Sequence, residues 1–128
     1  MKTFTKQWIK KAEEDYDAAR RLLESNFSHH AIICFHFQQA AEKYVKALLS
    51  ELEIEFIKTH DIELLITRFL LNTYPEFESV LSEASELSVY GVMPRYPGDY
   101  PEYNHKDSKD AHNAFLKIKQ IVENKLNR

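Results

Sequence analysis

Helix-breaking residues are concentrated in one short stretch, and this distribution constrains the fold more than any other feature of the sequence. The chain contains two glycines, and both lie in the segment YGVMPRYPGDYPEYNH at residues 90–105. The same segment holds three of the four prolines and four of the seven tyrosines. Because glycine and proline interrupt helices more strongly than other residues, the rest of the chain is free to form long helices.

Apolar residues recur every three or four positions through most of that remainder, which is the spacing of one face of a helix. The expected helices cover about residues 4–23, 29–52, 62–69, 75–87 and 108–126. Residues expected to face the core include Phe4, Trp8, Ala12, Ala19, Ile33, Phe37, Ala40, Tyr44, Leu48, Ile62, Leu65, Ile66, Phe77, Leu87, Phe115, Ile118 and Val122. The sequence therefore predicts an all-α, antiparallel up-and-down bundle of about five helices, with a long Pro/Tyr-rich loop before the last helix, in a single domain spanning residues 1–128.

Polar residues and one proline mark the expected helix starts. Short side-chain oxygens cap the free N–H groups of a first turn, and proline fits the first helical position. The expected starting residues are Ser28 for the second helix, Thr59 or Asp61 for the third, Pro75 for the fourth, and Asp107 or Ser108 for the fifth.

Composition narrows the class of protein. With 44% hydrophobic and 29% charged residues the chain has the balance of a folded domain, and its net charge of −3 provides no overall basic field for duplex DNA. The single cysteine, Cys34, excludes a disulfide framework. The N-terminus has no apolar signal core, and the longest uncharged run, at residues 26–41, is too short to span a membrane. We therefore expect a cytoplasmic protein that has no membrane partner.

The segment at residues 90–105 is long for a connection in a bundle, and such loops are more often functional or disordered than neutral. Its tyrosines provide apolar surface for packing, which argues against disorder. One interpretation is that Pro94 and Pro97 hold Arg95 and Tyr96 toward an anion and a ring. The other is a structural cover over the end of the bundle, with Arg95 merely exposed.

Polar residues of the second helix form a seam beside its apolar face. At 100° per residue His36, Gln39, Lys43 and Lys46 fall within an arc of about 80°. Two cations and two hydrogen-bonding side chains suit phosphate oxygens and base edges. The competing interpretation is a solvated flank in which Glu42 pairs with Lys46 at i+4.

Asp15 continues the inward spacing of the first helix. A carboxylate near the core needs a partner, which a lysine, arginine or tyrosine of another helix would supply. We expect a structural anchor for a cation; orientation of a site arginine is the alternative.

The six histidines do not form a familiar metal-binding spacing, so we expect neither a metal nor a cofactor. His60, in the stretch KTHDIELL, precedes a helix start where backbone N–H groups could hold an anion. The alternative is a histidine of the capping loop. Cys34, on an apolar helix face, is expected in the core.

Four stretches of the sequence together resemble the HEPN family, the nucleotide-binding domain of higher eukaryotes and prokaryotes. They are WIKKAEEDYDAARRLLE, FHFQQAAEKYVKALL, KTHDIELL and RYP, in this order along nearly the whole chain. The resemblance implies a bundle of about five helices, commonly a homodimer, often encoded beside a separate small nucleotidyltransferase. It also implies nucleotide or RNA binding, and some members are RNA-cleaving toxins of toxin–antitoxin or defence systems.

Matching positions can be carried over residue by residue. The resemblance extends to the RYP element (Arg95, Tyr96, Pro97), Gln39 and Lys43, the pair Thr59 and His60, and the inward Asp15. RNA-cleaving members have an arginine followed by a histidine after four to six residues, whereas Tyr100, Pro101 and Glu102 occupy those positions here. The first histidine is His105, and this departure weighs against cleavage, although a loop of different length could bring His105 near Arg95.

Three functional hypotheses follow. The first is a HEPN-type dimer that binds a nucleotide or RNA, or a nucleotidyltransferase: Arg95 and Lys43 contact phosphate, Tyr96 stacks on a base, and His60 and Gln39 add hydrogen bonds. The second is a metal-independent endoribonuclease in which Arg95 stabilises developing charge and His105 or His60 moves protons. The third is a non-catalytic protein-interaction module.

Overall fold

The computed structural model describes residues 1–91 and 102–127, and all described secondary structure is helical. The elements are α1 (Thr3–Leu23), α2 (His30–Glu51), α3 (Ile62–Phe69), the 3-10 helix η1 (Pro75–Val80), α4 (Leu81–Ser88) and α5 (His105–Leu126). The prediction of an all-α bundle is confirmed, and the long helices begin and end within a few residues of the expected positions.

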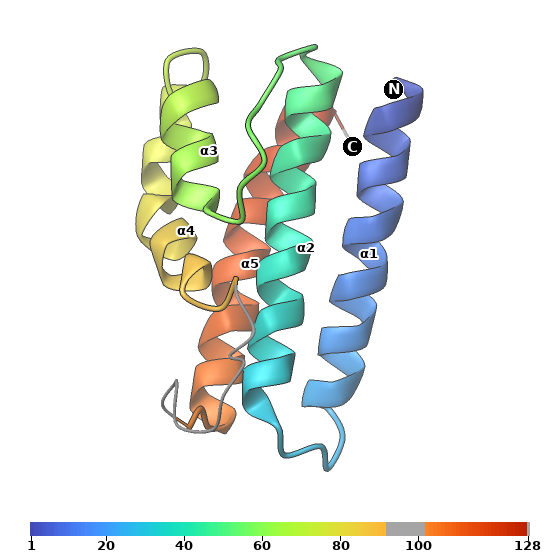
Figure 1. The fold of residues 1–128 in the computed structure, drawn as a ribbon, viewed down its shortest axis with the longest axis vertical. Helices are drawn as coiled ribbons and strands as arrows, with labels where there is room; N and C mark the ends of the chain where they lie inside the picture. The colour runs from blue at the N-terminus through green and yellow to red at the C-terminus, as the bar shows by residue number, and fades with distance from the viewer. Residues whose placement is uncertain (92–101, 128) are drawn as a thin grey trace.

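Helix α2 is the central element, with α1 on one side, α3 on the other and α5 behind it (Figure 1). The apolar side chains of α2 account for this position. Those of Ile33, Phe37, Tyr44 and Leu48 are fully or almost fully buried against the neighbouring helices. The start of α1 is attached to the end of α2, where the backbone N–H of Lys2 donates to the Glu51 carboxylate. Helices α1 and α2 therefore run antiparallel.

The chain does not alternate direction strictly after α2. Glu53 adopts a left-handed backbone conformation with φ of 58°. Residues 52–61 then run back along α2 in extended form, so that α3 points in the same direction as α2 (Figure 1). This return brings His60 beside the middle of α2 instead of its end.

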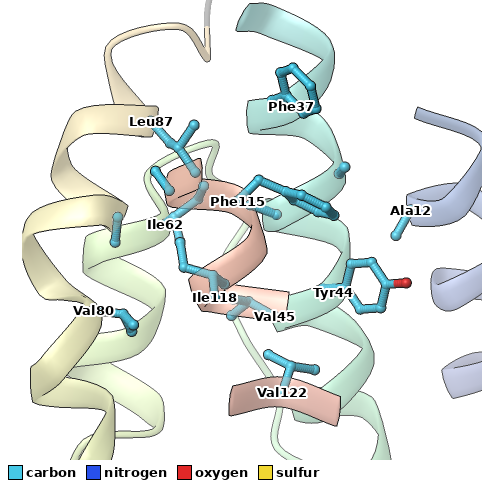
Figure 2. Close-up of a cluster of buried hydrophobic side chains, with 14 of the residues drawn as sticks. Ala12, Phe37, Tyr44, Val45, Ile62, Val80, Leu87, Phe115, Ile118 and Val122 are labelled. Carbon is cyan, nitrogen blue, oxygen red and sulfur yellow. The ribbon is translucent and has the colours of Figure 1, made fainter. Parts of the chain in front are cut away.

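Aromatic side chains fill the core between α2 and α5 (Figure 2). The Phe115 ring lies 6.1 Å from Phe37 and 5.9 Å from Tyr44 between centroids. All three residues have no exposed surface. Because truncation of such a core residue leaves a cavity, Phe115 is important for the packing of α5 on α2.

Some expected boundaries and orientations were wrong, each for a local reason. Helix α5 begins at His105, because Asn104 accepts from the backbone N–H of Asp107 and Asp107 accepts in return from that of Asn104, a capping box that starts the helix earlier. Helix α2 begins after His29, and no side chain caps it, so Ser28 is not its N-cap. The expected fourth helix begins at Pro75 but is divided into η1 and α4.

Phe4 was also expected to face the core, yet it is 72% exposed. The inward position is taken by Thr5, which is fully buried and donates to the Glu51 carboxylate at 2.9 Å. The buried face at the start of α1 is therefore rotated by one residue, to Thr5 and Ile9.

The described helices include none whose length and apolar character would let it cross a bilayer.

Candidate functional site

The RYP element lies in the part of the chain that the structure does not describe, so Arg95, Tyr96 and Pro97 are outside the described residues. The last described residue before this segment is Gly91, which is packed against the start of α3. A Cβ atom on Gly91 would lie 3.2 Å from His60 Cβ and 3.2 Å from Gln38 Nε2. The chain therefore enters the segment directly beside His60.

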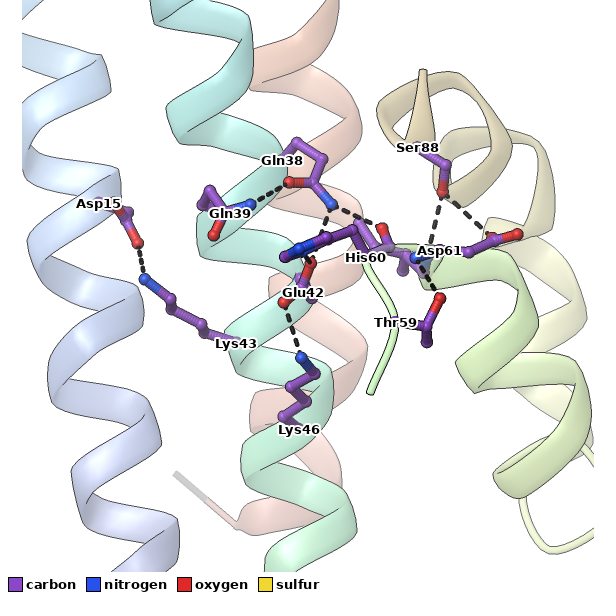
Figure 3. Close-up of polar contacts among 11 residues, drawn as sticks. Asp15, Gln38, Gln39, Glu42, Lys43, Lys46, Thr59, His60, Asp61 and Ser88 are labelled. Atoms are coloured by element: carbon purple, nitrogen blue, oxygen red, sulfur yellow. Dashed lines mark hydrogen bonds and ion pairs between the residues drawn. The ribbon is translucent and has the colours of Figure 1, made fainter. Parts of the chain in front are cut away.

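Glu42 is the centre of a buried polar network on the α3 side of α2 (Figure 3). Its side chain is 3% exposed. One carboxylate oxygen accepts from His60 Nδ1 at 2.9 Å and from Gln38 Nε2 at 3.2 Å. The other accepts from Lys46 Nζ at 2.8 Å, which confirms the expected Glu42–Lys46 pair.

Lys46 is buried although it is charged. Besides its ion pair with Glu42, its ammonium lies 5.5 Å from the centre of the Trp8 ring and 5.8 Å from that of Phe56. Aromatic faces attract cations, so the charge is compensated inside the protein. Lys46 therefore has a structural role inside the protein and is poorly placed to contact a ligand.

His60 is held at its backbone and at one ring nitrogen, while its side chain is 60% exposed. Gln38 Nε2 donates to the His60 carbonyl oxygen at 2.8 Å. The adjoining backbone N–H groups already have partners: Asp61 donates to Thr59 Oγ1, and Leu64 donates to the Asp61 side chain. Asp61 is thus the N-cap of α3, and an anion at this position would depend on the His60 side chain instead of on those N–H groups.

A second carboxylate lies between α1 and α2. Asp15 accepts from His36 Nδ1 at 3.1 Å and from Lys43 Nζ at 2.5 Å. Burial raises the pKa of the Asp15 carboxyl, but the hydrogen bonds and charges of His36 and Lys43 outweigh this, and the net pKa is below its usual value. The inward aspartate predicted from the sequence has a lysine and a histidine as its partners.

Gln39 lies between these two carboxylate clusters (Figure 3). It is partly buried, and its Nε2 donates to Gln38 Oε1 at 2.8 Å. The polar seam expected on α2 exists, but its members are paired with protein groups. Gln39 and Lys43 retain partial exposure, Lys43 with 24% of its side chain accessible.

His105 is the first residue of α5, near the other end of the undescribed segment. Its ring lies 5.8 Å from that of His30. His30 and Gln38 are eight residues apart on α2 (38 − 30), a rise of about 12 Å. Since His105 packs at the level of His30 and His60 at the level of Gln38, the structure does not bring these two histidines together.

Cys34 is buried as expected, and burial raises the pKa of its thiol to about 11. Its sulfur lies 3.8 Å from Ser108 Oγ, which also bonds His30 Nδ1 at 2.8 Å. Ser108 is fully buried, so this contact joins α2 to α5 and offers no nucleophile to solvent. Within residues 1–91 and 102–127, no group of three His, Cys, Asp or Glu side chains is arranged to hold a metal ion.

Sequence reasoning missed Gln38 altogether and treated Glu42 only as the partner of Lys46. Gln38, Glu42 and Lys46 recur every four residues, so they form one ridge along a helix. Every member of this ridge is buried. A polar ridge at the spacing of a core face was the available signal, because buried polar groups need partners.

Comparisons with known proteins cover nearly the whole chain. The family model described as HEPN domain matches residues 5–128. A protein of Methanocaldococcus jannaschii named "Putative toxin MJ1304" is 34% identical, with the similarity covering 95% of this chain and 90% of that protein.

Solved structures have the same arrangement of helices. ST0689, an archaeal HEPN homologue, matches with a TM-score of 0.75 and 31% identity over 97% of this chain and 98% of its own. TT1696 from Thermus thermophilus matches with a TM-score of 0.81 and 26% identity over 94% and 97%. An HEPN domain protein from Thermotoga maritima, 24% identical, shares the fold with a TM-score of 0.74 over 95% and 98%. This chain belongs to the HEPN domain family.

Proposed function

We propose that this HEPN-type protein binds a nucleotide or RNA at the surface formed by His60, Gln39 and Lys43 together with the RYP element. The observation that carries the proposal is His60: its ring is exposed, one ring nitrogen is fixed on a buried carboxylate, and Gly91, which precedes the RYP element in the sequence, packs beside it. Arg95 follows Gly91 by four residues in the sequence (95 − 91).

The roles follow from the chemistry of the side chains. Arg95 contacts phosphate oxygens, and Tyr96 stacks on a base, which is how aromatic residues commonly hold single-stranded nucleic acid. His60 and Gln39 add hydrogen bonds. Lys43 contributes through the N–H donors that Asp15 does not use, since an ammonium carries three. Pro97 and Thr59 orient the residues beside them.

We further propose that the protein acts as a homodimer and as the toxin-like component of a pair with a separately encoded nucleotidyltransferase. The similarity to the protein named as a toxin supports the toxin-like role, because it extends over nearly the full length of both chains. Size-exclusion chromatography with light scattering tests the dimer, and co-purification with the neighbouring gene product tests the pair.

Fluorescence anisotropy with a labelled single-stranded RNA tests the binding proposal. We expect saturable binding by the wild type and at least tenfold weaker binding by Arg95→Ala and by His60→Ala. Arg21→Ala is the matched control, since Arg21 is an exposed arginine on the last turn of α1. Equal affinity in all four proteins, or no binding by the wild type, contradicts the proposal.

The second candidate is a metal-independent endoribonuclease, which the similarity to a toxin favours. Arg95 would stabilise the negative charge that develops on phosphate, and His105 or His60 would transfer a proton to or from the ribose hydroxyl. Total RNA incubated with the protein in EDTA tests this reaction. Cleavage by the wild type that is lost in Arg95→Ala supports the nuclease. Intact RNA with both proteins rules out this reaction and leaves RNA binding without cleavage as the proposed function.

A further inference from the structure

We propose that Glu42 is a positioning residue that fixes the protonation pattern of the His60 ring, so that Nε2 accepts a hydrogen bond from a donor on the ligand, such as a ribose hydroxyl. This inference rests on the proposed nucleotide or RNA binding at His60. It assigns a role to three buried residues of α2, Gln38, Glu42 and Lys46, that the proposed contacts with the ligand do not use.

The first step is geometric. Gln38 and Glu42 hold His60 at two points, the backbone carbonyl at 2.8 Å and ring Nδ1 at 2.9 Å. Both residues project from consecutive turns of the central helix, and both are buried. The ring is therefore attached to buried side chains of the central helix, although 60% of its own side chain is exposed.

The second step is chemical. An ionised carboxylate only accepts hydrogen bonds, so the Nδ1 atom facing Glu42 must carry the proton. In the neutral ring Nε2 then has no hydrogen and can only accept. A partner that fixes one nitrogen in this way selects which ligand group the other nitrogen can bind.

The third step explains Lys46. Its ammonium donates to the second Glu42 oxygen at 2.8 Å and lies 5.5 Å from the centre of the Trp8 ring and 5.8 Å from that of Phe56. The lysine compensates the buried carboxylate and, being a donor only, cannot supply an alternative acceptor for His60. Removal of Glu42 alone would leave a buried cation without its ion-pair partner, so a useful variant must change both residues.

The double variant Glu42→Gln/Lys46→Met removes both charges and keeps similar volumes. An amide can either accept from or donate to Nδ1, so it no longer selects one ring tautomer. The methionine thioether can pack near the Trp8 and Phe56 rings, where the Lys46 ammonium lies in the wild type. Glu83→Gln/Lys117→Met is the matched control, because it removes an ion pair of 3.3 Å between α4 and α5 that the proposed site does not involve.

Two measurements test the proposal at pH 8, where an ordinary imidazole is neutral. Long-range ¹H–¹⁵N spectra report which ring nitrogen carries the proton, and anisotropy with the labelled RNA reports affinity. We expect the wild-type His60 ring to be protonated at Nδ1 alone and the Glu42→Gln/Lys46→Met ring to be a mixture. The loss of one oriented hydrogen bond should weaken RNA binding by a factor of roughly 5 to 30, with no change in the control.

The outcomes separate this inference from the proposed function. A wild-type His60 ring protonated at Nε2 overturns the inference, and this measurement needs no variant. Wild-type affinity in the folded double variant, beside weak binding by His60→Ala, also overturns it while the binding function stands. If the wild type binds no RNA, the proposed function itself fails.

Discussion

At the residue scale, the protein uses two carboxylates in the same way. Glu42 accepts from Lys46 and His60, and Asp15 accepts from Lys43 and His36. The two differ in burial, since the Glu42 side chain is 3% exposed and that of Asp15 is 16% exposed. This difference leads to separate expectations for stability.

Replacement of Glu42 should be strongly destabilising. Glu42→Ala leaves the buried Lys46 without its anion, and we expect a loss of about 3–5 kcal/mol in the free energy of unfolding, measured with urea. Glu42→Gln/Lys46→Met should recover most of that loss. A Glu42→Ala variant as stable as the wild type would mean that Lys46 is neutral in the variant or that its ammonium moves into solvent.

Asp15 should make stability depend on acid pH. Its pKa is below the usual value in the folded protein, so its contribution to stability is present above the ordinary aspartate pKa of about 3.9 and is lost as pH falls through the folded value. We expect Asp15→Asn to be about 2 kcal/mol less stable than the wild type at pH 7, with the difference shrinking below pH 4. Urea unfolding of both proteins at pH 7 and below pH 4 measures this difference in stability. A difference that does not change with pH would contradict the lowered pKa of Asp15.

Cys34 should be chemically inert in the folded protein. Burial raises the pKa of its thiol to about 11, so almost no thiolate is present at pH 8. We expect labelling by iodoacetamide to be slow in buffer and to accelerate with the fraction unfolded in urea. Rapid labelling without denaturant would indicate that α2 opens locally near Ser108.

The members of the two buried carboxylate clusters could be predicted from the sequence only in part. The inward position of Asp15 in the first helix identified it as a carboxylate that needs a partner from another helix. The partner could not be chosen, because Lys43 and His36 become neighbours of Asp15 only when α1 and α2 pack. His60 was singled out for its place before a helix, whereas its contact with Glu42 depends on the return of residues 52–61 along α2.

At the element scale, helices were predictable because apolar spacing is a local property of the sequence. Helix ends were less so, because several polar residues near each end could act as a cap. Asn104 and Asp107 form the capping box of α5, although Asp107 and Ser108 were equally reasonable starting points. The sequence has no comparable marker for the extended return of residues 52–61, which is determined by packing on α2.

The capping box provides a test of the observed boundary. Asn104→Ala should lower the free energy of unfolding by about 1 kcal/mol, since it removes the acceptor for the Asp107 N–H. Ser28→Ala should have little effect, because no side chain caps α2. Urea unfolding of the two variants distinguishes the positions; a larger effect at Ser28 would contradict the boundaries described above.

At the scale of the whole molecule, the fold brings three parts of the chain together beside the middle of α2. They are the seam residues of α2, the end of the extended return at His60, and Gly91 before the RYP element. The two clusters lie on opposite sides of Gln39 (Figure 3). The proximity of Gly91 to His60 could not be predicted from spacing, because the two are separated by α3, η1 and α4.

The most direct test of the proposed binding function is a titration of ¹⁵N-labelled protein with a short single-stranded RNA, followed by amide spectra. We expect saturable chemical-shift changes centred on Gln39, Lys43, His60 and Gly91, and Arg95→Ala should abolish them. Changes confined to the exposed surface around Phe4, or no changes at millimolar RNA, would contradict the claim that this part of the molecule binds a nucleotide or RNA.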